Sequence, residues 1–428
     1  MRAGFADIAV IGAGAAGLMA AISAGRAPAF RPLKVKLFDT RRKIGAKILV
    51  SGGTRCNVTN RTVSASDYEG GPSHFVKHVL EAFTSRQTME FFGRIGVELV
   101  LEPTGKYFPT THSGKTVLEA LLRESAAAGV ELASGVKITG IEKKTDIFYL
   151  KGLTDKGEGF AHEASRVILA TGGLSYPETG SDGTGYRIAQ SLGHTLKPTF
   201  AALTPLTTED AEWKELSGVA LEVKLVFFKA GKKVSERAGS FLFTHFGFSG
   251  PAALDISRFF AASRPEEGPQ IVASFVPGKT EEALKADYER AARGYGDKKL
   301  KNWLAETFGL PARFVETFLK KARFDTDTTL GRLTDAARRR LIHTLLNYPL
   351  EVTGVLGYKK AEVTAGGIDL TEVKVQTLES KRVPGLYFAG EILDIDGRIG
   401  GFNFQWAWSS GSVAGKSAVQ SLLKEIAA

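Results

Sequence analysis

The 428-residue sequence contains one cysteine, Cys56, so an internal disulfide framework is excluded. Its seven histidines form no recognisable set of metal ligands, and His74 and His78 have the spacing of a solvated helix face. No metal site is therefore expected. Long apolar runs are also lacking: residues 8–22 come nearest to a membrane or signal segment, but Asp7 precedes them and three glycines interrupt them. We expect a cytoplasmic protein with no membrane partner.

Acidic residues are outnumbered, which gives a formal net charge of +10 and indicates anionic partners such as a cofactor pyrophosphate, a nucleic acid or a phosphorylated substrate. Residues 26–47 hold eight basic side chains against the single Asp39, and residues 279–345 hold fifteen against ten acidic ones. The second stretch includes Arg338-Arg339-Arg340. Because a basic surface often serves only solubility, charge alone leaves contact with nucleic acid open.

The first sixty residues follow the order strand, glycine turn, helix and strand. Residues 7–11 are β-type, residues 15–23 form an Ala-rich helix closed by Gly25, and residues 34–38 alternate as a strand. This order predicts a βαβ unit. A helix is expected from Ser113 onward.

The predicted secondary-structure pattern changes three times in the later parts of the chain. Residues 167–170 are apolar throughout, as in a buried parallel strand, whereas alternating runs after Lys197 indicate a separate β-rich unit. Residues 280–347 have a charged helical pattern. The final segment, from Gly385, returns to strand, glycine turn and helix. We therefore expect an α/β protein in which a nucleotide-binding domain is split by an insertion of roughly 150 residues.

The strongest local motif is the sequence Gly12-Ala13-Gly14-Ala15-Ala16-Gly17, which follows an apolar strand and opens a helix. In such a fingerprint the first glycine permits a tight turn, the second lets the backbone approach a pyrophosphate, and the third lets the helix pack closely. Asp39 ends the next strand, where an acid can hydrogen-bond the ribose of an adenosine. An acid there disfavours a 2'-phosphate, although Arg41, Arg42 and Lys43 weaken that inference. NAD and FAD remain.

Two later segments favour FAD. Ala170-Thr171-Gly172-Gly173 resembles the second glycine signature of two-dinucleotide-fold flavoproteins, and Tyr387-Phe388-Ala389-Gly390-Glu391 resembles their flavin-side signature. In that signature an acid meets the ribityl chain and a helix N-terminus faces the flavin. The helix is expected to begin near 400–403, where its N–H groups would stabilise negative charge on a reduced flavin.

Five further motifs, in order along nearly the whole chain, resemble the BaiN/RdsA-like flavoproteins. They are Ser51-Gly52-Gly53-Thr54-Arg55-Cys56-Asn57, Phe243-Thr244-His245, Ser249-Gly250-Pro251, Val363-Thr364-Ala365-Gly366-Gly367 and Gly401-Phe402-Asn403-Phe404-Gln405-Trp406-Ala407. The sequence departs from that family at Asp39, where Glu is frequent, and at Thr54, where another Gly is often found.

The resemblance implies a Rossmann-like FAD-binding domain, 1–195 and 357–428, interrupted by a β-rich domain, 196–278 with 346–356, that carries a helical subdomain, 279–345. The fingerprint and the resemblance together predict the residues that contact FAD. These are Gly12, Gly14, Ala15, Ala16, Gly17, Asp39, Thr40, Lys47, Ser51, Gly52, Gly53, Arg55, Cys56, Asn57, Val136, Ala170, Thr171, Gly172, Gly173, Thr364, Gly366, Gly367, Gly390, Glu391, Asp396, Gly400, Gly401, Phe402 and Asn403.

Two residues are candidates for catalysis. Cys56 lies in a glycine-rich polar loop, where a thiol near the flavin would protonate one carbon of a C=C bond while hydride reaches the other. The alternative is a small residue that packs beneath the cofactor. His245 lies in an apolar, helix-opening segment of the insertion and would contact substrate or donate a proton, although a structural histidine is the commoner case.

Only one dinucleotide fingerprint is present, so any NADH or NADPH would bind transiently as an electron donor. The resemblance implies an FAD-dependent oxidoreductase, with reduction of uridine in ribosomal RNA to dihydrouridine, C=C reduction on small molecules and amine oxidation as alternatives. The basic helical stretch favours the RNA substrate, because a flipped-out base needs a phosphate-binding surface beside its pocket. A small-metabolite enzyme and a non-catalytic flavin-containing protein that binds RNA or a partner remain open, as does the oligomeric state.

Overall fold

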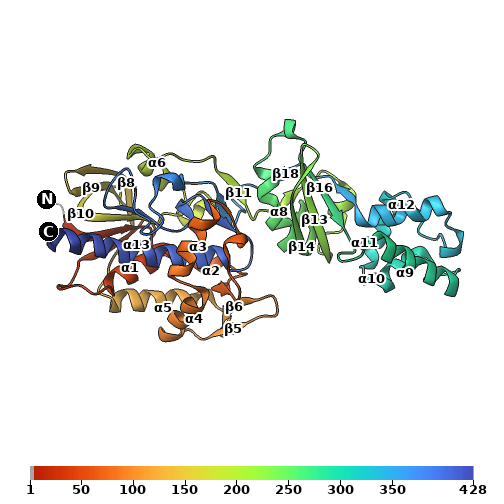
Figure 1. Ribbon diagram of the computed structural model, residues 1–428, viewed down its shortest axis with the longest axis horizontal. Helices are drawn as coiled ribbons and strands as arrows, with labels where there is room; N and C mark the ends of the chain where they lie inside the picture. Colours follow the sequence, from red (N-terminus) through yellow and green to blue (C-terminus); the bar gives the residue numbers. More distant parts are fainter. Residues whose placement is uncertain (1–3, 428) are drawn as a thin grey trace. The chain divides into compact units, whose positions relative to one another are not determined.

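The computed structural model describes residues 4–427, and the chain divides into two compact units (Figure 1). Unit 1 comprises Met1–Phe200 with Glu362–Ala428, and unit 2 comprises Ala201–Ala361. The finer domain boundaries expected from the sequence stay a prediction. Within residues 4–427, no helix is both long enough and apolar enough to span a bilayer.

Unit 1 is built on a seven-stranded sheet in the order β7-β2-β1-β10-β9-β8, with β20 paired to β10. The strands β1, β2, β7, β10 and β20 are parallel to one another, whereas β9 pairs antiparallel with β10, and β8 pairs antiparallel with β9. Their bounds are β1 Gly4–Ile11, β2 Val35–Asp39, β7 Glu131–Ser134, β8 Val136–Lys144, β9 Ile147–Thr154, β10 Gly159–Leu169 and β20 Leu386–Phe388. The predicted βαβ unit and the buried strand before Ala170 are both present.

Helices α1 (Ala15–Gly25) and α13 (Phe402–Ala427) lie along each other beside this sheet (Figure 1). Glycine makes the contact close: a Cβ on Gly411 would lie 2.5 Å from the backbone oxygen of Ala16, and one on Gly415 would lie 2.3 Å from that of Ala20. Thus the Gly/Ser/Ala composition of the last helix reflects its packing on α1.

Unit 1 also contains further helices and short strands. The helices are α2 Ala46–Val50, α3 Ser73–Ala82, α4 Ser85–Arg94, α5 Gly114–Ala127 and α6 Thr184–Ser191; the strands are β3 Thr59–Asn60, β4 Tyr68–Gly70, β5 Leu99–Leu101, β6 Lys106–Pro109, β19 Val363–Ala365 and β21 Ile395–Gly397. The strand β11, Phe200–Ala202, spans the boundary between the units.

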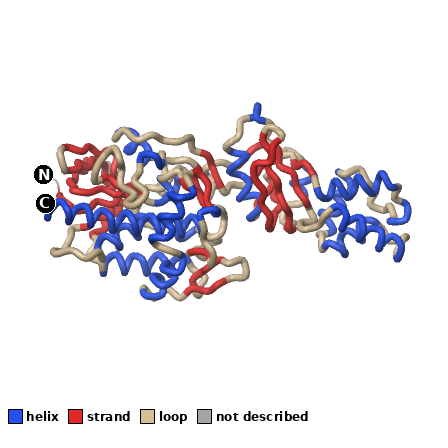
Figure 2. The backbone as a smooth tube through the Cα atoms, viewed as in Figure 1, coloured by secondary structure: helices blue, strands red, loops and turns tan. Residues whose placement is uncertain are grey.

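Unit 2 combines a seven-stranded sheet, β17-β16-β13-β14-β15-β12-β18, with helices (Figure 2). The strands are β12 Leu206–Thr207, β13 Ala220–Lys229, β14 Lys232–Thr244, β15 Gly247–Ser249, β16 Gln270–Ser274, β17 Tyr348–Leu350 and β18 Gly354–Val355. The helices are α7 Ala211–Glu215, α8 Pro251–Ala261, α9 Glu281–Gly294, α10 Leu300–Phe308, α11 Ala312–Lys321 and α12 Asp335–Leu346. Buried residues of sheet and helices, such as Phe243 and Phe314, belong to one hydrophobic cluster.

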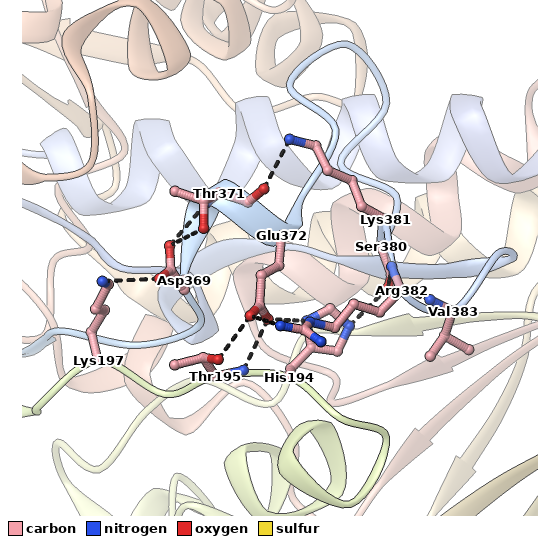
Figure 3. A network of polar contacts seen from close by, with 10 residues as sticks. All are labelled: His194, Thr195, Lys197, Asp369, Thr371, Glu372, Ser380, Lys381, Arg382 and Val383. Carbon is pink, nitrogen blue, oxygen red and sulfur yellow. Dashed lines mark hydrogen bonds and ion pairs between the residues drawn. The ribbon is translucent and has the colours of Figure 1, made fainter.

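A buried polar network in unit 1 joins the segment that leaves this unit to the segment that returns to it (Figure 3). His194 Nδ1 lies 3.1 Å from Glu372 Oε2, and His194 Nε2 lies 2.8 Å from Ser380 Oγ. The Glu372 carboxylate also accepts from the Thr195 N–H at 2.9 Å and from Arg382 at 2.5 Å. The two chain segments are therefore fixed to each other by a carboxylate with several donors.

The same network makes the stability of unit 1 sensitive to acid. Burial alone would raise the pKa of Glu372, but hydrogen bonds from Arg382 and Thr195 outweigh it and lower the pKa from 4.5 to about 2. Burial lowers the pKa of His194 below 6.5 despite the neighbouring carboxylate. The unfolded chain therefore takes up protons first at both groups, and stability falls as the pH drops below 6.5 and again between 4.5 and about 2.

Glu372→Gln tests this account. The variant loses charge-assisted hydrogen bonds, so we expect its free energy of unfolding to fall by about 2 kcal/mol at neutral pH, with a flatter dependence on pH in the acid range. Thermal unfolding of the holoprotein across a pH series measures both effects. The control is Glu158→Gln in an exposed turn; equal losses in the two variants would show that the network contributes nothing specific.

Candidate active site

The predicted fingerprint forms a tight turn between β1 and α1, and each glycine in it has a steric reason. Gly12 has φ +103°, and a Cβ there would lie 2.5 Å from the backbone oxygen of Ala170. A Cβ on Gly17 would lie 1.7 Å from the Gly12 oxygen. A Cβ on Gly14, in contrast, would meet no atom within 4 Å. The turn therefore packs tightly against the protein at Gly12 and Gly17 and is open at Gly14.

The open side of the turn suits an anion. Gly14 is the N-cap of α1, no side chain caps this helix end, and the first turn of α1 holds no acidic residue. The free N–H groups of a helix N-terminus favour negative charge. These residues thus fit the pyrophosphate of a dinucleotide.

Asp39 has a second function beside the expected ribose contact. Its Oδ2 accepts from the Ala13 N–H at 2.7 Å and its Oδ1 accepts from the Arg41 N–H at 2.8 Å. Burial raises the pKa of Asp39 even though both bonds oppose the shift. The Asp39 carboxylate therefore binds the backbone of the turn and holds it in shape.

A second set of predicted residues meets around Glu391. Lys47 Nζ on α2 lies 2.6 Å from Glu391 Oε2, and the Thr364 N–H donates to Glu391 Oε1 at 3.0 Å. Ser175 completes the cluster: its hydroxyl donates to Glu391 Oε1 at 2.6 Å and lies 2.7 Å from Lys47 Nζ. The Thr364 hydroxyl in turn accepts from the Ser175 N–H at 3.0 Å. Lys47, Ser175, Thr364 and Glu391 are hereafter the Glu391 cluster.

Ser175 was not predicted from the sequence. The available signal was its place two residues after the glycine signature that ends at Gly173, and Gly173 itself has to be glycine because a Cβ would lie 2.5 Å from Thr364 Oγ1. Tyr176 follows in a left-handed conformation, with φ +49°. A left-handed backbone is uncommon for a bulky residue and tends to occur at functional sites.

The fingerprint and the Glu391 cluster belong to one region at the carboxyl ends of parallel strands. Gly12 touches the backbone of Ala170 at the end of β10, and a Cβ on Gly390, after β20, would lie 2.6 Å from the Ala16 side chain. Ligands of open α/β sheets bind at this edge.

The loop from Ser51 to Asn57 is strained. Gly52, Gly53, Thr54 and Cys56 all have positive φ, with +70° at the β-branched Thr54. Glycine would adopt this conformation at position 54 without the steric cost that threonine has. Arg55 lies over the Phe108 ring, 4.0 Å from its centroid, and 2.6 Å from Glu102.

Asn57 connects this loop to the start of α13. With its amide oriented to satisfy both ends, Asn57 accepts from the Gly401 N–H at 2.9 Å and donates to Thr59 O at 3.0 Å. Gly401 has φ +90°, and Asn403 binds both backbone groups of Gly397 at 2.8 Å. The predicted glycine turn before the last helix is therefore present, and its side-chain amides hold the backbone.

Cys56 is completely buried among apolar residues, with 0% of its surface exposed. Burial raises the pKa of the thiol to about 12, against a smaller opposing effect of Ser51. This environment favours the packing interpretation. His245 lies in unit 2, exposed in the turn between β14 and β15, and the nearest helix, α8, begins only at Pro251. The catalytic assignment of both residues stays a prediction.

Other predicted contacts lie outside the clusters described above. Gly366 and Gly367 are needed for close backbone packing, because a Cβ on them would lie 2.1 Å from Pro198 O and 2.7 Å from Ile392 O. Thr40 is exposed after β2, Val136 begins β8, and Asp396 is buried in β21.

Comparison with known proteins identifies the family. A family model described as the HI0933-like protein Rossmann domain matches residues 6–417. The ribosomal RNA dihydrouridine synthase of Escherichia coli strain K12 is 34% identical over 407 residues, 94% of this chain and 96% of that protein. The corresponding synthase of Haemophilus influenzae is 31% identical over 94% of this chain and 95% of its own length.

A relative named for a different substrate has a comparable identity. The 3-dehydro-bile acid delta(4,6)-reductase of Clostridium scindens is 32% identical over 419 residues, 96% of this chain and 99% of that protein. The chain therefore belongs to the HI0933-like family and is an FAD-dependent oxidoreductase with a Rossmann-type cofactor domain.

Proposed function

We propose that this enzyme reduces an activated C=C bond with electrons from NADH or NADPH, and that its substrate is a uridine in ribosomal RNA, which becomes dihydrouridine. One observation carries the proposal: two relatives named as ribosomal RNA dihydrouridine synthases match 94% of the chain at 34% and 31% identity. The uracil 5,6 double bond is conjugated to a carbonyl, so it accepts hydride at one carbon and a proton at the other.

Bound FAD would supply the hydride, and the residues of unit 1 would hold the cofactor. We assign the pyrophosphate to the Gly12–Gly17 turn, the adenosine ribose to Asp39, and the ribityl side to the Glu391 cluster. Lys47 orients the Glu391 carboxylate, because an ion pair at 2.6 Å between partly buried groups is favourable. NADH or NADPH would bind transiently and regenerate the reduced flavin.

The second candidate is reduction of a C=C bond in a small metabolite. The bile acid reductase from Clostridium scindens favours it, because that relative is as similar to this chain as the RNA-modifying ones. Both candidates share one reaction class, so the cofactor site serves either. They differ in the need for a surface that binds nucleic acid.

Gly14→Ala tests the assignment of the cofactor site. The φ of −80° at Gly14 is ordinary for alanine and a Cβ meets no protein atom, so we expect an unchanged fold. The methyl group would occupy the space assigned to the pyrophosphate, so FAD affinity should fall by about tenfold or more. Fluorescence titration of the apoprotein with FAD measures it. Gly93→Ala, also a substitution into open space, is the control, and unaltered affinity in Gly14→Ala would refute the assignment.

Cys56→Ala distinguishes a catalytic role of the thiol from a packing role. Because Cys56 is buried and its pKa is raised to about 12, we expect substrate reduction within a few-fold of wild type and a loss of about 1 kcal/mol in stability. Steady-state turnover, with FAD content measured in the same samples, is the readout. A loss of turnover by several orders of magnitude with FAD retained would establish the catalytic role.

Deletion of the gene tests the RNA substrate. We expect ribosomal RNA from deleted cells to lack a dihydrouridine that mass spectrometry detects in the parent strain, and complementation to restore it. Complementation with Gly14→Ala should restore less of the modification, because this variant is expected to bind FAD more weakly and the reduction needs bound FAD. Identical ribosomal RNA in deleted and parent cells would remove uridine as the substrate and leave the small-metabolite candidate.

A further inference from the structure

The three consecutive arginines of α12 point in different directions. Successive residues of a helix are about 100° apart around its axis, and of the three, Arg338 is the one that forms ion pairs with carboxylates of the described residues 4–427. It lies 3.1 Å from Asp335 and 3.9 Å from Glu289, with its guanidinium over the Tyr288 ring. Arg338 is therefore already neutralised by carboxylates of α9 and α12.

Arg340 is held in place without a carboxylate. Its guanidinium lies over the Phe324 ring, 4.3 Å from the centroid, and its Nη2 donates to the backbone oxygen of Arg323 at 3.3 Å. Arg339 is exposed beside it, and within residues 4–427 no carboxylate forms an ion pair with Arg323, Arg339 or Arg340. A planar guanidinium that is oriented in advance and unpaired is suited to phosphate oxygens.

Arg323 occupies a backbone position that normally selects glycine. It follows α11 with φ +57°, its N–H donates to Lys320 O at 3.0 Å, and the Phe324 N–H donates to Leu319 O at 2.8 Å. This is the left-handed residue that terminates a helix, where glycine and asparagine are preferred. A charged side chain therefore stands at a position where glycine would fit the backbone with less strain.

The two lysines at the end of α11 are paired with carboxylates, whereas Asp325 is bound by a backbone N–H. Lys320 lies 2.6 Å from Glu212, and Lys321 forms ion pairs with Asp210 and Glu212. The Asp325 carboxylate accepts from the Asp327 N–H at 3.0 Å. Arg323, Arg339 and Arg340 are exposed and form no ion pair with a carboxylate within residues 4–427, and we name these three residues the arginine patch.

We propose that the arginine patch binds the phosphates of an RNA substrate. The inference rests on the proposed function, since a substrate uridine in ribosomal RNA brings a polyanion to the enzyme. Three guanidinium groups without a carboxylate partner, Arg323 just after α11 and Arg339 and Arg340 within α12, complement the charge of a phosphodiester backbone, whereas a small metabolite needs no such surface.

Arg323→Gly and Arg339→Gln test the patch in the holoenzyme, with a fluorescein-labelled RNA stem-loop as the probe. We expect each variant to bind it roughly threefold to tenfold more weakly and to lower the slope of log affinity against log salt by about one. Arg323→Gly should also raise the melting temperature, because glycine fits the left-handed position. A merely structural arginine would not lose RNA affinity while stability rises.

Lys233→Gln is the control with the same change in net charge, since Lys233 lies on β14 and pairs with Glu236 at 2.7 Å. The proposal would be overturned if the arginine variants bound the RNA stem-loop as tightly as the wild type, or if Lys233→Gln lost as much RNA affinity as they do. The two proposals fail separately: weaker RNA binding in the variants, together with unchanged ribosomal RNA in deleted cells, would retain the patch and remove uridine reduction.

Discussion

The cofactor region of unit 1 depends on close packing of main-chain atoms at the carboxyl ends of β1 and β10. Gly12 lies against the main chain of Ala170, and Gly17 lies against Gly12 itself. A side chain at either position would separate the turn, the helix and the neighbouring strand. The same constraint recurs at α13, where Gly411 and Gly415 let the last helix lie on α1. Close packing at these glycines leaves Gly14 as the open point of the turn.

The two acids of the site are held by the protein through different sets of donors. Asp39 is fixed by backbone N–H groups of Ala13 and Arg41, whereas Glu391 is fixed by the side chains of Lys47 and Ser175 and by the backbone N–H of Thr364. A carboxylate with fixed donors keeps its remaining lone pairs in a fixed direction. Both acids are therefore oriented before any hydroxyl group of a cofactor arrives.

The sequence predicted those parts of the site that depend on neighbouring residues. The turn from Gly12 to Gly17, its flanking strand and helix, and the strand before Ala170 follow from local periodicity and glycine spacing. Contacts between distant segments had no such signal. Ser175 and Glu391 are separated by 216 positions, and only the folded chain shows that their side chains meet.

Burial was the other property that the sequence did not reveal. Cys56 lies in a glycine-rich polar segment, and that composition left a catalytic thiol and a packed small residue as alternatives. In the structure, positive φ values occur at Gly52, Gly53, Thr54 and Cys56, and position 56 is buried while Thr54 is exposed. Local composition reports which residues are near along the chain, whereas exposure depends on the direction in which the backbone turns.

The basic stretch of unit 2 shows the same limit for charge. A count of arginines treats residues 338 to 340 as one positive segment, yet helical geometry sends Arg338 to the carboxylates of α9 and α12 and Arg340 to an aromatic ring. What matters for a polyanion is the charge that remains unpaired and held in position, because paired charge adds little to the surface potential that RNA meets. By that measure Arg323, which lies outside the run and in a left-handed turn, belongs with Arg339 and Arg340, whereas Arg338 does not.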